Sequence, residues 1–275
     1  MMPTNSKIAI IIVTYRPNWK IIEKNVQELG KKNSIYISDN GTADLKEKTK
    51  RLKKYSTVNI IENKSNLGIG MAQNIAINII KKEEKAEYIF FLDQDSFITQ
   101  QSLALLLKDI KELQKSTLVG CLAANSKEIG KNIVSKEEVI SSGMLIPISA
   151  IKKIGMMKDD LFIDMIDYEW CWRAIKKGFA LFEDERVIFK HQIGSEKKVL
   201  NKQIIAPFRL YYVFRNTLYL VNLPDYRNHK KKWTVKLFKQ AVFNIVFCPE
   251  KKERLYFIYR GIKDAKNKHL GKLTM

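Results

Sequence analysis

Residues 88–96 have the sequence YIFFLDQDS, in which five apolar residues lead directly into two carboxylates, Asp93 and Asp95. Such a short, continuous apolar run is typical of a strand buried on both faces. Acids that follow a strand lie at the carboxyl edge of the sheet, where open α/β folds bind ligands. Carboxylates at i and i+2 can direct oxygens at one hard cation, with phosphate supplying further ligands. The alternative is an ordinary turn or helix cap, since Asp and Ser favour both.

Three apolar runs precede this stretch, and each is followed by a polar turn and a helical pattern. Strands are predicted at residues 7–13, 34–38 and 58–61, and helices at 19–29, up to about 54, and at 71–82. Strands that alternate with helices in this way predict an α/β fold with a mostly parallel sheet. Each crossover is expected to be right-handed.

After Asp95 the pattern is less regular. Helices are predicted at residues 101–113, 148–154 and 167–177, and strands at 117–123, 140–146, 179–182 and 187–190. From residue 201 onward only helices are predicted, at 207–223, 230–247 and 249–269. We therefore expect a catalytic domain over residues 1–200 and a helical appendage over residues 201–275.

Positive charge is concentrated at the end of the chain. The 275 residues contain 49 Lys and Arg against 29 Asp and Glu, a formal charge of +20, and residues 201–275 carry 17 basic against four acidic residues. The same segment holds 13 of the 28 aromatic residues. A basic, aromatic-rich segment suits an anionic membrane surface, a phosphate-bearing substrate or nucleic acid.

The cysteines and the hydropathy pattern indicate a cytoplasmic protein. Cys121, Cys171 and Cys248 are odd in number and lack metal-site spacing, so we expect reduced thiols. The apolar run at residues 8–13 is too short for a signal peptide. Since no window approaches the roughly 18 apolar residues of a membrane span, a soluble or surface-bound protein is expected.

Polar clusters follow all four amino-terminal strands and should converge at one edge of the sheet. They are Thr14-Tyr15, Asp39-Asn40, the segment from Asn66 to Asn74, and the Asp93/Asp95 pair. The segment Gly68-Ile69-Gly70 does not fit a dinucleotide fingerprint, because the third glycine and the following acid are missing. No P-loop sequence is present either.

A second acidic cluster comprises Asp164, Asp167 and Glu169, and it lies beside Trp170. Either aspartate could serve as a helix N-cap. However, an aromatic shelf next to a carboxylate suits sugar binding, with the acid free to accept a hydroxyl proton. His191, at the end of a predicted strand, is either a further metal ligand or an ordinary polar residue.

These motifs, taken in order, resemble those of the inverting family 2 glycosyltransferases, and especially the rhamnosyltransferase branch. The resemblance covers nearly the whole chain. It rests on these segments: Val13-Thr14-Tyr15, Ser38-Asp39-Asn40, Asn66-Leu67-Gly68 with Ala72 and Asn74, Phe91-Leu92-Asp93-Gln94-Asp95, Ser142-Gly143, Phe162-Ile163-Asp164, Asp167-Tyr168-Glu169-Trp170-Cys171 with Arg173, His191-Gln192-Ile193-Gly194, Tyr212 with Arg215-Asn216, and Arg260-Gly261-Ile262-Lys263-Asp264.

The resemblance implies the GT-A fold, a Rossmann-like sheet with flanking helices, and a role for each matching residue. Asp167 would be the catalytic base, while Asp95 and His191 would bind a divalent cation, Mg²⁺ or Mn²⁺. The nucleotide would be bound by Thr14, Tyr15, Asp39, Asn66, Gly68 and Asp93. The acceptor or the sugar would be bound by Ser142, Gly143, Asp164, Glu169, Trp170 and Arg215. The family's Glu-Asp pair is replaced here by Ile166-Asp167, so Glu169 stays a second candidate beside the acceptor.

The implied activity is transfer of L-rhamnose from dTDP-L-rhamnose to a saccharide acceptor in capsule, O-antigen-like or cell-wall polysaccharide synthesis. The expected acceptor is a saccharide carried on polyprenyl diphosphate. UDP-galactofuranose, a UDP-hexose or a UDP-N-acetylhexosamine are alternative donors. A nucleic-acid-binding protein is disfavoured, because carboxylates at the strand ends would repel phosphate. A sugar-nucleotide pyrophosphorylase is disfavoured because a glycine-rich, basic amino-terminal loop is missing.

Residues 230–247 carry an apolar stripe opposite a lysine-bearing face, and this pattern predicts a helix that lies in the interface of an anionic membrane on the cytoplasmic side. The stripe consists of Trp233, Leu237, Phe238, Ala241, Val242 and Ile245. The alternative is a helix that packs on the catalytic domain or on another subunit of a homo-oligomer.

Overall fold

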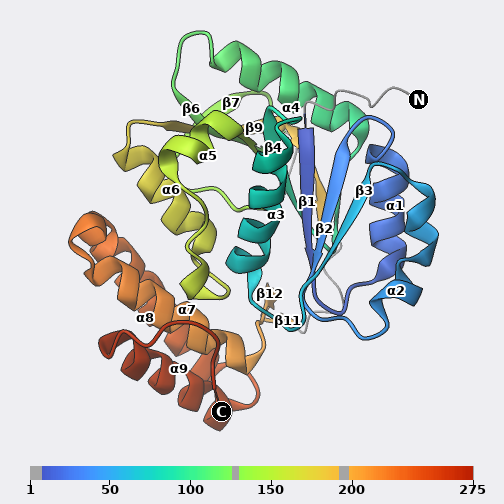
Figure 1. Cartoon of the computed structure of the whole chain (residues 1–275). Helices are drawn as coiled ribbons and strands as arrows, with labels where there is room; N and C mark the ends of the chain where they lie inside the picture. The colour runs from blue at the N-terminus through green and yellow to red at the C-terminus, as the bar shows by residue number, and fades with distance from the viewer. Residues whose placement is uncertain (1–7, 126–129, 192–197, 275) are drawn as a thin grey trace.

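A computed structural model describes residues 8–125, 130–191 and 198–274, and its main feature is an eight-stranded mixed sheet (Figure 1). The strand order is β3-β2-β1-β4-β8-β6-β9-β7. The strands are β1 (Ile8–Thr14), β2 (Ser34–Asp39), β3 (Val58–Glu62), β4 (Tyr88–Asp93), β6 (Val119–Asn125), β7 (Ile133–Lys136), β8 (Met144–Pro147) and β9 (Ala180–Ile188). Strands β1 to β4 are parallel, as predicted.

The second half of the sheet departs from the expected pattern. Strand β8 is antiparallel to both β4 and β6, and β7, which was not predicted, is antiparallel to β9. The two strands predicted at 179–182 and 187–190 are a single strand, β9, followed by the two-residue strand β10 (Lys190–His191). Polar residues inside β9, such as Glu183 and Asp184, interrupt the apolar pattern by which a strand is recognised.

Helices cover both faces of the sheet (Figure 1). One face packs on α1 (Trp19–Leu29) and α4 (Gln100–Leu113), and the other on α3 (Ile69–Glu83), α5 (Ile148–Ile154) and α6 (Ile166–Lys176). Alternate residues of strand β1 point to opposite faces of the sheet and belong to different hydrophobic cores, so helices are needed on both faces. The Lys-rich helix expected to reach residue 54 consists of α2 (Leu45–Lys48) and a 3-10 helix, η1 (Lys50–Lys54).

The carboxyl-terminal region is helical, as predicted, and is made of α7 (Pro207–Asn222), α8 (Lys230–Val246) and α9 (Lys251–Lys266). Gly261 permits close packing of α9 on α7, because a Cβ there would lie 2.6 Å from the Tyr211 carbonyl oxygen. Leu220 and Trp233 join the core that contains α3 and α6. Helices α7 and α8 therefore pack against the α/β part of the chain, and α9 packs on α7.

The remaining elements are short. They are the 3-10 helices η2 (Asp159–Leu161) and η3 (Pro224–His229), the strand β5 (Ser96–Phe97), which pairs with β10, and the hairpin of β11 (Lys198–Val199) and β12 (Lys202–Gln203). None of the helices in the described ranges is long and apolar enough to cross a membrane.

Candidate active site

Two adjoining cavities lie beyond the carboxyl ends of β1 and β4. One has a volume of about 460 Å³ and the other about 420 Å³, and five residues line both: Ile69, Gln73, Asp93, Ile163 and Arg209. We call the first the acid cavity, because Asp164 and Asp167 line it. The second is called the strand-end cavity, because Tyr15 and residues 93–95 line it.

The Asp-Gln-Asp motif forms one wall of the strand-end cavity, as its position after β4 predicted. The side chain of Gln94 accepts a hydrogen bond from the Tyr15 N–H at 2.8 Å and donates one to the Tyr15 carbonyl at 3.3 Å. It thereby ties the end of β1 to the end of β4. On the other side, the Asp93 N–H donates to Ser142 Oγ at 3.1 Å.

Asp39 and Thr14 lie behind this wall and do not line either cavity. Asp39 is fully buried, and its Oδ2 accepts hydrogen bonds from the hydroxyls of Thr14 and Thr42, both at 2.7 Å. The Thr42 N–H donates to Oδ1. The carboxylate therefore fixes the turn after β2, and the neighbouring Asn40 presents the lining surface.

The Asn66–Gly68 turn connects the strand-end cavity to the segment that begins at Phe162 and precedes α6. Asn66 Oδ1 accepts from the Gly68 N–H at 3.0 Å, and the Ile69 N–H donates to the Phe162 carbonyl at 2.7 Å. Gly68 has φ +86°, and a Cβ there would lie 2.4 Å from Phe162 O. Only glycine fits both this backbone conformation and this close approach.

Residues 162–165 hold a strained backbone conformation. Phe162, Asp164 and Met165 all have positive φ, between 64° and 68°. The side-chain amide of Asn216 donates to the carbonyls of Leu161, Ile163 and Asp164 at 2.8 to 3.0 Å. Such strain persists only where surrounding contacts enforce it. Here α7 enforces it, and the result is a fixed position for the aspartates that follow.

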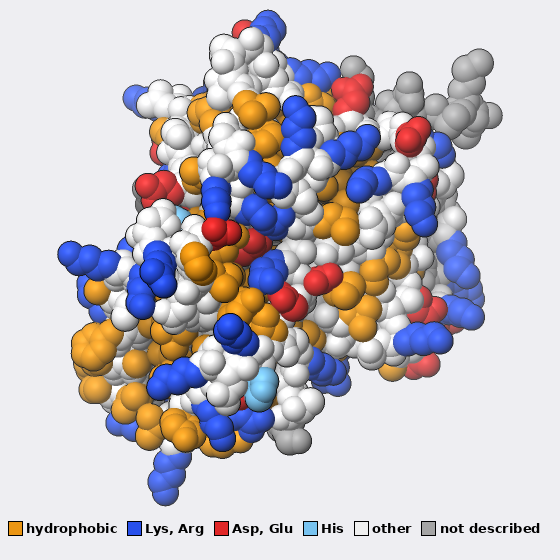
Figure 2. Space-filling model, turned by 60° about the vertical axis from the view of Figure 1, so that its left-hand side comes forward, with side chains coloured by type: hydrophobic (Ala, Val, Ile, Leu, Met, Phe, Trp, Pro, Cys, Tyr) orange, Lys and Arg blue, Asp and Glu red, His pale blue; other side chains and the backbone are white. Residues whose placement is uncertain are grey.

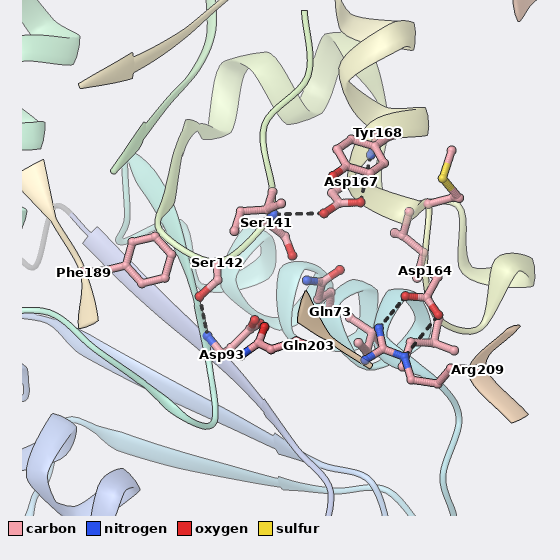
Figure 3. Close-up of a pocket in the computed structure, with 15 residues that line it drawn as sticks. Gln73, Asp93, Ser141, Ser142, Asp164, Asp167, Tyr168, Phe189, Gln203 and Arg209 are labelled. Atoms are coloured by element: carbon pink, nitrogen blue, oxygen red, sulfur yellow. Dashed lines mark hydrogen bonds and ion pairs between the residues drawn. The ribbon is translucent and has the colours of Figure 1, made fainter. Parts of the chain in front are cut away.

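Asp167, in the first turn of α6, points into the acid cavity (Figure 3). Its Oδ2 accepts from the Ser141 N–H at 3.3 Å and its Oδ1 from the Tyr168 N–H at 3.0 Å. Burial raises the pKa of Asp167 from its ordinary 3.8 to about 6, and the charge of Asp164 adds to this, although the backbone hydrogen bonds oppose it. A carboxylate with this pKa is ionised at neutral pH and has increased basicity, as a general base requires.

Arg209, in the first turn of α7, was not predicted as a site residue, yet it lines both cavities. Its guanidinium contacts Asp164 twice, with Nη2–Oδ1 at 2.5 Å and Nε–Oδ2 at 3.3 Å (Figure 3). A positive charge is thus held at the junction of the two cavities. Helical spacing offered a signal, because residues 209, 212 and 216 share one face of α7.

Gln73 was also missed, and it lies in the middle of the site (Figure 3). Its side chain is buried, with 3% exposure, and its Oε1 has no hydrogen-bond partner among the described residues. A buried acceptor without a donor costs about 1–3 kcal/mol. Because Gln73 lines both cavities, a ligand hydroxyl is a natural donor for this oxygen.

Three residues expected at the acceptor lie in the protein interior and line neither cavity. Glu169 accepts from Arg173 and from the Tyr226 hydroxyl, and Trp170 Nε1 donates to the Gly155 carbonyl. Arg215 is fully buried and donates to the carbonyls of Leu161 and Gly271. These side chains support the strained segment and α6 instead of facing a ligand.

Ser142 lines the acid cavity, and Gly143 lies just behind it. Gly143 has φ +87°, its N–H donates to the Phe91 carbonyl at 2.8 Å, and a Cβ there would meet the Phe189 ring at 3.0 Å. The pair therefore positions the loop from which Ser141 contacts Asp167.

The family model of glycosyl transferase family 2 matches residues 9–180, which is more than half of the chain and includes all the strand-end motifs. The chain is a family 2 glycosyltransferase. A dTDP-rhamnosyl transferase of Shigella flexneri, RfbF, is 30% identical over 251 residues, covering 82% of each chain. An uncharacterised glycosyltransferase of Methanocaldococcus jannaschii is 21% identical and covers 95% of this chain and 94% of its own.

Solved structures show that this glycosyltransferase has the GT-A fold. Residues 1–349 of TarS from S. aureus superpose with a TM-score of 0.56 at 15% identity, covering 94% of this chain and 80% of that TarS chain. GalNAc-T7, solved with UDP, GalNAc and Mn²⁺, superposes with a TM-score of 0.63 at 13% identity, covering 95% of this chain and 56% of its own.

The carboxylates of this glycosyltransferase that fit a divalent cation are Asp93 and Asp95, since both line the strand-end cavity. Within the described residues there is no cluster of three His, Cys, Asp or Glu side chains that could hold a metal. Two carboxylates suit a cation that takes its other ligands from water and a diphosphate. The backbone of His191 pairs with Ser96, next to Asp95, while its side chain lies outside the described part of the structure.

Proposed function

We propose that this enzyme transfers L-rhamnose from dTDP-L-rhamnose to a saccharide hydroxyl, with inversion at the anomeric carbon. The similarity to RfbF over most of both chains supports this donor. The observation that carries the reaction type is the geometry of the adjoining cavities. Asp167 lies in one, residues 93–95 line the other, and Asp93, Gln73 and Arg209 lie at their junction.

The donor nucleotide binds in the strand-end cavity, bordered by Tyr15, Asn66 and Gly68, with Thr14 and Asp39 fixing the turn behind it. The acceptor enters the acid cavity. Its hydroxyl gives its proton to Asp167, and the oxygen forms a bond to the anomeric carbon. The bond from that carbon to the β-phosphate oxygen breaks, and its electron pair leaves with dTDP. One carboxylate suffices, because a single displacement forms no covalent intermediate.

Negative charge grows on the leaving diphosphate, so cationic groups placed there lower the barrier. Arg209 is the side chain in position to do this, at the junction of the cavities. Asp93 and Asp95 would hold a divalent cation, with His191 as a proposed further ligand. Such a cation supplies Lewis-acid stabilisation of phosphate oxygens when bound. GalNAc-T7, solved with Mn²⁺, makes Mg²⁺ or Mn²⁺ the natural choice.

The proposed acceptor is a saccharide carried on polyprenyl diphosphate at the cytoplasmic face of the membrane, where capsule, O-antigen-like or cell-wall polysaccharides are assembled. The high positive charge of residues 201–275 supports an anionic, lipid-linked acceptor.

A calorimetric titration of the full chain with dTDP-L-rhamnose, UDP-galactofuranose, UDP-glucose and UDP-N-acetylglucosamine, with and without Mg²⁺ or Mn²⁺, tests this function. We expect dTDP-L-rhamnose to bind most tightly and only with the metal. Asp95→Asn should require a higher metal concentration for the same donor affinity. If one of the UDP-sugars bound more tightly than dTDP-L-rhamnose, that UDP-sugar would become the proposed donor. Salt-dependent DNA binding without binding of any nucleotide sugar would contradict the function itself.

A further inference from the structure

Helix α8 has a second apolar face, which the protein leaves uncovered. Four side chains spaced along one side of the helix, Val235, Phe238, Val242 and Val246, are 42 to 69% exposed. We call these four residues the exposed stripe. The stripe predicted from the sequence combined two faces, because Trp233 and Leu237 are buried whereas Phe238 and Val242 are not.

The neighbouring helix α9 adds to this apolar surface. Leu255, Tyr256 and Tyr259 are 51 to 64% exposed. Figure 2 shows hydrophobic side chains gathered over the carboxyl-terminal helices, with lysine and arginine side chains around them. An exposed apolar area with a charged rim marks an interaction surface more often than scattered single side chains do.

The charge around the exposed stripe is strongly positive. Helices α8 and α9 together contain eleven basic and two acidic residues, and α8 itself contains no acid. Its first turn consists of Lys230, Lys231 and Lys232. The helix macrodipole favours acids at this end and disfavours lysines. Lys232 pairs with Glu137 and Glu138 of the same chain. Because helix stability does not account for Lys230 and Lys231, an external anionic partner is the better explanation for these two.

We propose that the exposed stripe and the lysines around it bind the surface of an anionic phospholipid bilayer. The apolar side chains would enter the boundary between headgroups and acyl chains, and the lysines would lie at the phosphates. A symmetric dimer through this face would bring two strongly positive surfaces together, since a two-fold interface joins identical patches. Charge complementarity therefore favours the lipid surface over a second copy.

Flotation of the full-length protein with phosphatidylcholine vesicles, with and without phosphatidylglycerol, tests the proposal. We expect binding only to the anionic vesicles and a loss of binding at high salt. Phe238→Ser with Val242→Ser should weaken binding about tenfold, because two inserted side chains are lost. Leu118→Ser is the matched control: its side chain is 49% exposed but lies on the sheet domain, and it should have no effect.

A charge-reversal pair separates lipid binding from folding. Lys230→Glu with Lys231→Glu should weaken vesicle binding by about fivefold for each lysine, while the melting temperature stays equal or rises, because acids suit this helix end. Lys50→Glu with Lys53→Glu, on the distant helix η1, should leave binding unchanged. Donor affinity, read by calorimetry, should be unaffected in all these variants.

Equal binding of wild type and both α8 variants to anionic vesicles would overturn the proposal. So would a wild-type dimer in sedimentation velocity that the Phe238 and Val242 substitutions dissociate, with no vesicle binding, since the face would then be a subunit interface. Vesicle binding requires no turnover, so this result stands whether or not the proposed donor is correct.

Discussion

The two sides of the active site are assembled in different ways. On the sheet side, Asp93, Gln94 and Asp95 follow one strand and are neighbours in the sequence. On the helical side, Asp164 and Asp167 precede or begin α6, while Arg209 comes from α7, more than forty residues later. The sheet side carries two carboxylates that line the strand-end cavity, whereas the helical side holds an ion pair and a basic carboxylate. We infer that the first side binds the donor and the second performs the proton transfer.

Among the variants that test this division, Asp167→Asn should have the largest effect. The amide cannot accept the acceptor's proton, so turnover should fall by about 10² to 10⁴. Donor affinity, which we assign to the other side, should be unchanged by calorimetry. If Asp167→Asn instead lost donor binding with normal turnover at saturation, the division between the two sides would be wrong. Near-normal activity would move the base to Asp164.

Arg209→Gln should have the next largest effect, a loss of about 10² in turnover, because one preorganised positive charge no longer faces the leaving diphosphate. Arg209→Lys should recover part of it. Arg215→Gln is the matched control on the same helix. It removes the guanidinium that donates to the Gly271 carbonyl and, together with Asn216, to the Leu161 carbonyl, so it should lower the melting temperature before it affects turnover. An Arg209→Gln enzyme with full turnover and reduced stability would make the ion pair purely structural.

Gln73→Leu should have a smaller effect, a loss of about tenfold in kcat/KM. The substitution removes a buried acceptor that has no partner among the described residues, so the protein should gain stability. At the same time it removes the hydrogen bond that we assign to a sugar hydroxyl. Thermal denaturation checks the expected gain in stability, and steady-state kinetics check the expected loss in kcat/KM. Lower stability without any kinetic change would show that Gln73 is only a packing residue.

The sequence predicts the sheet side of the active site better than the helical side. The sheet side could be predicted because strand ends are visible as apolar runs that stop at polar residues, and a parallel sheet brings those ends together. Arg209 and Gln73 were missed because each lies on a helix, and the side that a helical residue faces depends on tertiary packing. The Asp164–Arg209 pair joins residues 45 positions apart, a contact that no local pattern encodes.

Some residues of the matching motifs proved to support the site from behind. The resemblance implied that Arg215 binds the acceptor or the sugar, and Asn216 follows it in the same motif. The structure uses both to hold the carbonyls of a strained segment. Glu169 is similar, because its charge is paired with Arg173 inside the protein. A motif shows which residues belong together, but not which of them touch the ligand.

The smallest expected effect is the pH dependence between pH 7.5 and 6, and it also concerns the helical side alone. Asp167 must be ionised to accept a proton, and its pKa is raised to about 6. Therefore kcat/KM should fall about tenfold per pH unit below 6 and change by only about twofold between pH 7.5 and 6. Donor affinity at fixed metal concentration should not show this limb, because we assign donor binding to the sheet side, whereas Asp167 lies on the helical side.

The raised pKa of Asp167 also affects the stability of the fold, and in the opposite direction to activity as the pH rises. The folded protein binds the Asp167 proton more tightly than the unfolded chain, so the contribution of this group is largest below pH 3.8 and is lost as pH rises through 6. Asp167→Asn removes that dependence. The difference in melting temperature between the variant and the wild type should therefore shift in favour of the variant from pH 4 to pH 7. A constant difference would show that burial does not raise this pKa.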